Sequence, residues 1–168
     1  MADSATTKKA LADALKQELK EKTFPKINIG ELCDRCGINR KSFYYHFRDK
    51  YDLVNWIFES EFLSVHPPMS DPWQSMDELC GYFYENRDFY RKVLRIKGQN
   101  SFGEYFHELC RDAFCRKLGR GGQAEFCATF YADACLCAVE RWLCAHECAL
   151  PQDFVAHLRG CLPLPTVD

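Results

Sequence analysis

The chain has 168 residues, of which 47% are hydrophobic and 27% charged, and its formal net charge is −2. This length suits one or two small domains and excludes a large enzyme with an added module, while the hydrophobic content excludes an intrinsically disordered chain. No apolar run approaches the roughly 20 residues that span a bilayer, and the first residues lack the apolar core of a secretion signal. We therefore expect a cytoplasmic protein without a membrane partner.

The cysteines and the charges are distributed unevenly. Eleven cysteines lie between Cys33 and Cys161, and this odd, scattered set indicates reduced thiols used as small apolar residues. Residues 1–50 carry 11 Lys or Arg and 7 Asp or Glu, whereas residues 51–168 carry 11 and 17. A basic head on an acidic body favours contact of the head alone with a polyanion.

The first two predicted elements are helices. Leu11, Leu15 and Leu19 recur every four residues, which predicts an amphipathic helix from residues 4–7 to residue 22. Pro25 ends this helix, and Asn28 is placed to cap a second, short helix over residues 29–35.

A glycine turn and a third helix follow directly. Gly37 stands where a helix commonly ends in a left-handed residue, and Asn39 can cap a helix over residues 40–46. Phe43 and Phe47 lie four residues apart and should be buried. Asp49 is then expected to cap a fourth helix, which runs to about residue 65 and is closed by Pro67 and Pro68.

The remaining chain also reads as helical. Further helices are predicted over residues 75–85, 87–97 with Asn86 as cap, 101–118, 122–146 and 151–162. We therefore expect an all-α protein of about nine helices. Residues 1–50 should form a three-helix helix-turn-helix DNA-binding domain, and residues 51–168 a helical bundle for dimerisation and regulation.

The segment from Gly37 to Phe47 is the predicted reading element. Two short helices joined by a glycine turn, the second with cations and aromatics outward, suit insertion of a helix into the major groove of DNA. Arg40 and Lys41 can reach guanine acceptors, and Ser42 or Tyr44 can touch base edges. The flanking groups should contact phosphate and fix the docking. The predicted DNA-binding residues are Asn28, Arg40, Lys41, Ser42, Tyr44, Tyr45, His46 and Lys50.

Residues 6–55 resemble the DNA-binding domain of the TetR/AcrR family of transcriptional regulators. The resemblance is carried most specifically by Phe43-Tyr44-Tyr45-His46-Phe47, followed by Lys50 and Leu53. It implies that the aromatic string ends the recognition helix and that Lys50 contacts backbone phosphate. The chain departs from the common pattern at Gly30, a position that can carry a base-reading side chain, so one possible base contact is absent. Asn28 also replaces the usual Thr, and Cys33 a small Ala.

The body resembles the shorter branch of this family, related to the dihydroxyacetone-kinase operon regulator. The resemblance rests on residues 82–90, 98–102 and 140–143, and it implies a homodimer joined through the last two long helices. The helix predicted over residues 122–146 is apolar over much of its circumference, which also favours cover by a second chain. The dimer-interface candidates are Phe126, Phe130, Ala134, Cys137, Trp142, Phe154 and Leu158.

Several interpretations of the body stay open at this point. Aromatic residues could line an effector pocket, although plain core is the favoured interpretation; these candidates are Trp73, Tyr82, Phe83, Tyr90, Phe102 and His107. The regulating partner would be a small-molecule effector or a coactivator protein. A thiol-based redox sensor and an adaptor that keeps the head fold without reading DNA are the alternatives.

The sequence gives little support for catalysis or for metal binding. Cys33 and Cys36, and likewise Cys144, His146 and Cys148, could contribute metal ligands, but their spacing favours structural packing. Neither a catalytic constellation nor a phosphate-binding glycine loop stands out. We expect no enzyme activity, no cofactor and no metal.

Overall fold

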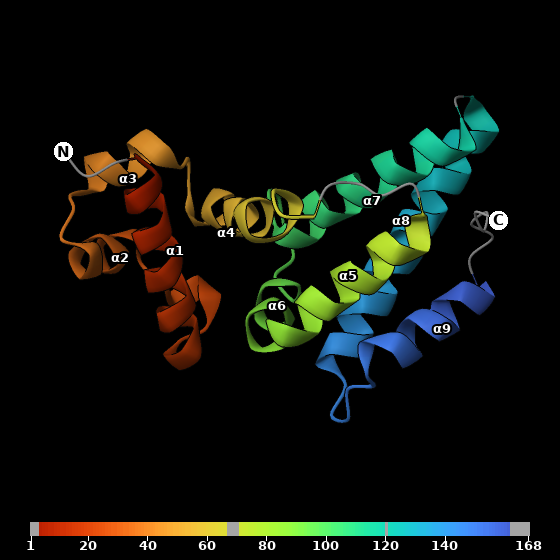
Figure 1. Ribbon diagram of the computed structural model, residues 1–168. Coiled ribbons are helices and arrows are strands. Elements are labelled where there is room, and N and C mark those ends of the chain that lie inside the picture. Colours follow the sequence, from red (N-terminus) through yellow and green to blue (C-terminus); the bar gives the residue numbers. More distant parts are fainter. Residues whose placement is uncertain (1–3, 67–70, 120, 162–168) are drawn as a thin grey trace.

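The computed structural model describes residues 4–66, 71–119 and 121–161, and within these residues the chain forms helices and no strands (Figure 1). The segments are α1 (Ser4–Glu21), η1 (Phe24–Lys26), α2 (Ile29–Cys36), α3 (Arg40–His46), α4 (Lys50–Phe58), η2 (Glu59–Leu63), α5 (Pro72–Glu85), α6 (Arg87–Val93), α7 (Phe102–Leu118), α8 (Gly122–Cys144) and α9 (Pro151–Cys161). The predicted all-α class and the number of about nine α-helices are confirmed for this part of the chain.

Helices α1, α2 and α3 form a head at one end of the elongated molecule, and α5 to α9 form the body at the other end (Figure 1). The leucines that predicted α1, Leu11, Leu15 and Leu19, are buried together with Leu32 of α2 and Phe43 of α3. Helix α4 leads from the head into the body. The buried apolar residues of the two parts belong to one continuous core.

The fourth helix differs from the prediction in its second half. It begins at Lys50 with Asp49 as its cap, but α4 ends at Phe58 and one turn of π-helix, η2, follows. In this turn the amide of Ser64 donates to the carbonyl oxygen of Glu59 at 2.9 Å, five residues earlier. The wider turn redirects the side chains of Glu61 and Phe62 relative to a regular helix. Pro67 and Pro68, expected to close this segment, lie outside the described residues.

Helices α5 and α6 differ from the predictions in three respects. Helix α5 begins at Pro72, three residues early, because the Asp71 side chain accepts a hydrogen bond from the amide of Trp73. Asn86 does not cap α6 with its side chain. Its amide group donates instead to the carbonyl of Tyr82 at 3.0 Å, so it serves the end of α5. Helix α6 stops at Val93 rather than residue 97.

The longest helices of the body, α7 and α8, pack along each other, and α9 packs on α5 (Figure 1). Ser101 caps α7 by accepting from the amide of Glu104. Helix α8 ends at Cys144, two residues before the predicted end, and the predicted end of the last helix at Leu162 lies outside the described residues. No described helix is both long and apolar enough to cross a membrane.

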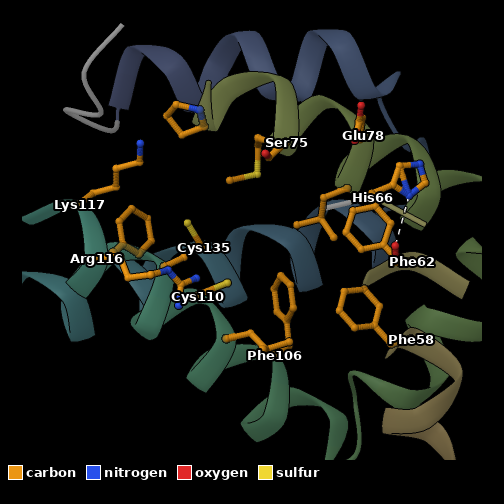
Figure 2. A pocket seen from close by; sticks show the side chains of 16 residues that line it. Phe58, Phe62, His66, Ser75, Glu78, Phe106, Cys110, Arg116, Lys117 and Cys135 are labelled. Carbon is orange, nitrogen blue, oxygen red and sulfur yellow. Dashed lines mark hydrogen bonds between the residues drawn. The ribbon is translucent and has the colours of Figure 1, made fainter. Parts of the chain in front are cut away.

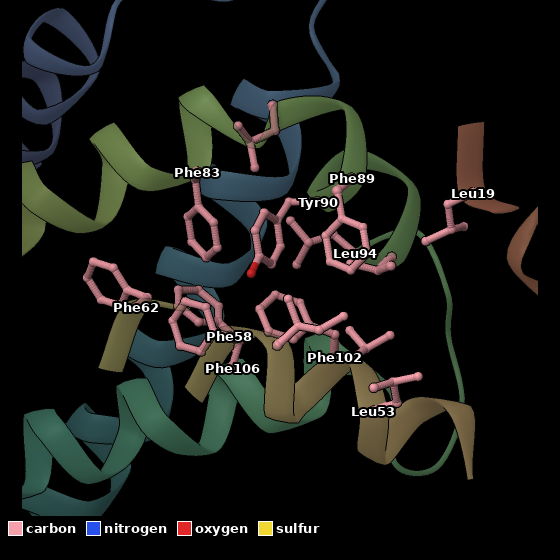
Figure 3. Packing of buried hydrophobic residues seen from close by; sticks show 14 of the residues in the cluster. Leu19, Leu53, Phe58, Phe62, Phe83, Phe89, Tyr90, Leu94, Phe102 and Phe106 are labelled. Carbon is pink, nitrogen blue, oxygen red and sulfur yellow. The ribbon is translucent and has the colours of Figure 1, made fainter. Parts of the chain in front are cut away.

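An aromatic cluster fills the body where four helices meet. Figure 3 shows Phe58 of α4 facing Phe83 of α5, Tyr90 of α6 and Phe102 and Phe106 of α7. The ring centroids of Phe58 and these four partners are 5.4 to 6.3 Å apart, which is the range of favourable aromatic contacts. The cluster ties α4, and through it the head, to the body.

Candidate nucleic-acid interface and body cavity

Capping side chains and one glycine define the α2–turn–α3 unit. The Asn28 side chain accepts from the amide of Gly30 at 2.7 Å, and the Asn39 side chain accepts from the amide of Ser42 at 2.8 Å. Gly37 has φ +63°, a left-handed conformation that favours glycine. Both predicted caps and the predicted turn are confirmed, and they fix the angle at which α3 leaves the head.

Helix α3 has one buried face and one open face. Phe43 and Phe47 are buried, and the Phe47 ring packs at 5.8 Å from Trp56 of α4. On the open face the side chains of Tyr44 and Tyr45 are 57% and 83% exposed. Large apolar side chains are rarely left this open without a partner, so this face has the character of a binding surface.

The structure brings the predicted DNA-contacting residues to one side of the head. Arg40, Lys41, Tyr44 and Tyr45 are exposed on α3, with Ser42 and His46 half-buried beside them. A hollow next to α3 is lined by Lys41, Ser42, Tyr45 and His46 together with Ser4 and Thr7 of α1. The start of α1 therefore belongs to this surface. Ser4 and Thr7 could not be predicted from the sequence, because only the tertiary packing places them beside α3.

Lys50 has an intramolecular role that the sequence did not predict. Its ammonium group donates to the carbonyl oxygens of Phe24, Pro25 and Ile27 at 2.8, 3.3 and 2.9 Å, and it lies 4.7 Å from the centre of the Phe24 ring. Burial lowers the pKa of Lys50. The ammonium group thus holds the η1 connection against the start of α4, and its contact with phosphate stays a prediction.

A carboxylate inside the head joins α1 to α2. Glu18 is only 1% exposed and binds Lys22 at 2.8 Å and Arg35 of α2 at 2.5 Å. The hydrogen bond from Lys22, followed by that from Arg35, lowers the pKa of Glu18 against the opposing effect of burial. Lys22 also binds Glu31 of α2 at 2.9 Å. These ion pairs fix the position of α2 relative to α1.

A cavity of about 270 Å³ lies in the body between η2, α5, α7 and α8 (Figure 2). Its wall is mostly apolar, and the side chains that line it include Phe62, Met76, Leu79, Phe106, Leu109 and Phe114. Charged and polar side chains at the cavity are His66, Ser75, Glu78, Arg116 and Lys117. Its size is just below the usual range for small-molecule sites, about 300–1,000 Å³.

The aromatic residues proposed for an effector pocket do not line this cavity. Four of them, Trp73, Phe83, Tyr90 and Phe102, are buried in the core. Tyr82 bonds through its hydroxyl to Tyr90, and His107 packs between α7 and α8 with Nε2 at 3.1 Å from Asp133. For all six residues, packing within the chain is therefore a better description than lining an effector pocket. Helical spacing identifies apolar residues but not which of them border a void.

An apolar stripe runs along the open face of α8. Phe126 and Phe130 are 67% and 59% exposed, and Ala134 and Cys137 are exposed one and two turns further on. The other interface candidates are used inside the chain: Trp142 is buried and stacks on Phe154 at 4.4 Å, and Leu158 is buried as well. The surface available to a second copy is therefore narrowed to the first four residues, called here the α8 stripe.

All eleven cysteines are free, and those on the core side carry protonated thiols. Burial raises the pKa of Cys110 well above its usual value and that of Cys135 to about 11. A protonated, buried thiol reacts slowly with oxidants, so a redox-sensing role is not favoured. No group of three or more His, Cys, Asp or Glu side chains within the described ranges is arranged to hold a metal ion.

Comparison with known proteins finds a family match for each of the two parts of the chain. Residues 5–57 match the family described as bacterial regulatory proteins, tetR family, and residues 71–162 match a transcriptional regulator C-terminal region. The first match extends past the predicted domain boundary at residue 50 and takes in most of α4, so that boundary stays a prediction.

Relatives and solved structures agree with these matches. The chain is 29% identical over 109 residues to the HTH-type dhaKLM operon transcriptional activator DhaS of Lactococcus lactis subsp. lactis (strain IL1403), a match that covers 63% of this chain and 57% of that protein. The fold is similar to a solved dihydroxyacetone kinase operon activator DhaS, with TM-score 0.64, 22% identity and coverage of 94% and 96% of the two chains. NalD of Pseudomonas aeruginosa, the secondary repressor of the MexAB-OprM multidrug efflux pump, gives TM-score 0.59, 21% identity and coverage of 95% and 96%.

Proposed function

Because the chain belongs to the tetR family of bacterial transcription regulators, which are not enzymes, we propose that it binds a roughly palindromic DNA operator as a homodimer. The observation that carries this proposal is the open face of α3, where Tyr44 and Tyr45 are exposed beside Arg40 and Lys41. In the bound state α3 lies in the major groove. The protein acts in the cytoplasm, where bacterial DNA is found.

The residues of this surface divide into two groups. Arg40 and Lys41, at the first turn of α3, read base edges, with Ser42 and Tyr44 beside them. Tyr45 and His46 contact backbone phosphate, and so do Asn28 at the start of α2 and Lys50. Lys50 acts on DNA partly through the η1 connection that it holds in place.

Two variants test this division on DNA. The bound site is first selected from a random-sequence duplex library by the wild-type protein, and affinities are then measured by fluorescence anisotropy. Tyr45→Ala should weaken binding to selected and random duplexes by a similar factor, whereas Arg40→Ala should also relax discrimination at one base position by about 5- to 150-fold. Equal losses on both duplexes for Arg40→Ala would contradict its reading role.

The α8 stripe supports the homodimer. A two-fold pair formed through this stripe covers the exposed rings of Phe126 and Phe130 and places two heads on one duplex. Two reading helices then contact two half-sites about one helical turn or more apart. Since α3 has only seven residues, a single head offers few base contacts, and useful specificity depends on the pair.

The body cavity supports control by a small molecule. Its mostly apolar wall, with His66 and Glu78 at one side and Arg116 and Lys117 at the other (Figure 2), suits a compact, largely apolar ligand that carries a few polar groups. Such a ligand changes DNA affinity only if it binds one spacing of the two heads better than another.

A polar relay connects the cavity region to the head. Glu61 in η2 accepts hydrogen bonds from Lys16 of α1 at 2.6 Å and from the Tyr82 hydroxyl of α5 at 3.1 Å, and Tyr82 in turn contacts Tyr90 at 2.8 Å. The next residue, Phe62, lines the cavity. A ligand that moves the η2 turn therefore moves the carboxylate that holds α1.

A coactivator protein bound to the body is the second candidate for control. It is supported by the burial of the aromatic residues that were the first candidates for an effector pocket. Ala113→Phe, which places a ring at the cavity wall on α7, separates the two mechanisms. The substitution should abolish a small-molecule response measured on DNA binding, whereas a protein coactivator that docks elsewhere on the body should still act.

An adaptor that keeps the head fold without reading DNA is the remaining alternative. The basic and aromatic groups retained on the open face of α3 argue against it. The test is the binding experiment itself, because an adaptor would show no preference between the selected and the random duplex.

A further inference from the structure

Gly30 lies in the first turn of α2, next to the first residue of α3. A Cβ atom added at Gly30 would stand 2.6 Å from Nη2 and 3.2 Å from Nε of Arg40. Real Cβ atoms essentially never show a contact as short as the first of these distances. The guanidinium group of Arg40 therefore occupies the space that any side chain at position 30 would take.

The backbone does not require glycine at this position. Gly30 is part of a regular helix, and its φ lies outside the positive range that side chains avoid, in contrast to Gly37. Glycine in a helix is costly relative to alanine because it loses more conformational freedom on folding. The local feature that explains a glycine here is the close approach of Arg40.

The guanidinium group of Arg40 lies against Gly30 while its donors stay available. The Arg40 side chain makes no hydrogen bond or ion pair with any other residue in the described parts of the chain. Burial raises the pKa of the nearby Cys33 thiol, and the positive charge of Arg40 opposes this rise. A guanidinium group that rests on the α2 backbone has fewer accessible rotamers than one in open solvent. Less conformational freedom is then lost when it forms a bidentate contact.

We propose that Gly30 is a specificity-determining residue that acts through Arg40, by leaving the space from which the guanidinium group reads its base. This proposal rests on the proposed function, since it assumes that Arg40 contacts a base. The absence of a side chain at position 30 removes one possible base contact. It also determines the position of a second base contact, the one that Arg40 makes.

Gly30 is not required for the stability of the head. The atoms that a Cβ would displace are the far end of a flexible side chain, so the fold can accommodate alanine. The contact of 3.2 Å to Oδ1 of Asn28 requires the capping side chain to shift by a few tenths of an ångström. Gly30→Ala should therefore leave the melting temperature unchanged or higher, while the position of Arg40 changes.

The experiment is a double-mutant cycle on DNA. The wild type, Gly30→Ala, Arg40→Ala and the double variant are titrated against the duplex selected by the wild type and against its single-base variants. Gly81→Ala is the matched control, because Gly81 is also helical but has open space around it. We expect Gly30→Ala to reduce discrimination by at least about fivefold at the base position that Arg40→Ala identifies. The double variant should lose no more discrimination at that position than Arg40→Ala alone.

Three results overturn the proposal. They are unchanged discrimination by Gly30→Ala, a loss at a base position different from that of Arg40→Ala, and additive losses in the double variant. A melting temperature well below that of Gly81→Ala would assign the effect to folding and overturn it as well. Failure of the wild type to prefer any duplex would instead refute the proposed function, and the proposal with it.

Discussion

Replacing Phe126 and Phe130 by serine should dissociate the proposed dimer while leaving the protomer folded. Both side chains lie on the open face of α8, and neither belongs to the buried core. Their removal therefore takes little packing from the single chain. It removes the largest apolar groups of the α8 stripe.

The size of the effect follows from the exposed area. A phenylalanine covers about 200 Å², so exposures of 67% and 59% leave about 250 Å² per protomer and about 500 Å² in a two-fold pair. At about 25 cal/mol per Å², complete burial of this area contributes about 12 kcal/mol, which is an upper bound. If one third of this area is covered, the loss is about 4 kcal/mol, or about a thousandfold in the dissociation constant.

Sedimentation velocity over a range of protein concentrations measures this change. The wild type should sediment as a dimer, and the double variant as a monomer at concentrations where the wild type is fully paired. Val65→Ser is the control, since Val65 is similarly exposed but lies outside α8. A double variant that stays dimeric, or a wild type that is monomeric at every concentration, would refute the reasoning.

Three further predictions concern polar contacts, and urea unfolding measures each of them. Glu61→Gln should lower the free energy of unfolding by about 1–2 kcal/mol through the weakened pair with Lys16, and an unchanged midpoint would contradict a relay that holds α1. Glu18→Gln should lower it by about 1–3 kcal/mol at pH 7. Because Lys22 lowers the folded-state pKa of Glu18 below 4.5, this stabilisation is present above that value and is lost as the pH falls through the folded-state pKa, so a pH-independent difference would argue against it. Lys50→Met keeps the apolar stem but removes three hydrogen bonds to carbonyl oxygens, so it should lower the free energy of unfolding by about 1–3 kcal/mol. Equal stability of this variant and the wild type would show that these hydrogen bonds do not hold η1 against α4.

Local signals predicted the head accurately. The two caps form between residues that are close in the sequence, Asn28 with Gly30 and Asn39 with Ser42. The turn depends on the left-handed conformation of Gly37 itself. A short stretch of sequence is therefore enough to predict these features. The same logic failed at Asn86, where two helices meet. An asparagine there can serve the end of one helix or the start of the next, and here both its backbone amide and its side-chain amide donate to the carbonyl of Tyr82 at the end of α5.

Contacts between segments far apart in the sequence could not be predicted from such local signals. Lys50 reaches carbonyl groups more than twenty residues away, so its contacts depend on how α4 packs on η1. Arg40 lies against Gly30, so its position depends on how α3 packs on α2. The cavity was missed for a related reason. Hydrophobic spacing predicts which residues face inward, but a void forms where inward-facing side chains from different helices fail to meet.

The salt dependence of DNA binding tests the central claim most directly. Affinities of the wild type for the selected duplex and for a random duplex of equal length are measured at several salt concentrations, together with the number of protomers bound. We predict two protomers per selected duplex and a clear preference for that duplex at every salt concentration. The logarithm of the binding constant should fall with the logarithm of the salt concentration with a slope of about −2 or steeper, since each head neutralises at least one phosphate. Salt-independent binding, or equal affinity for both duplexes, would contradict the central claim.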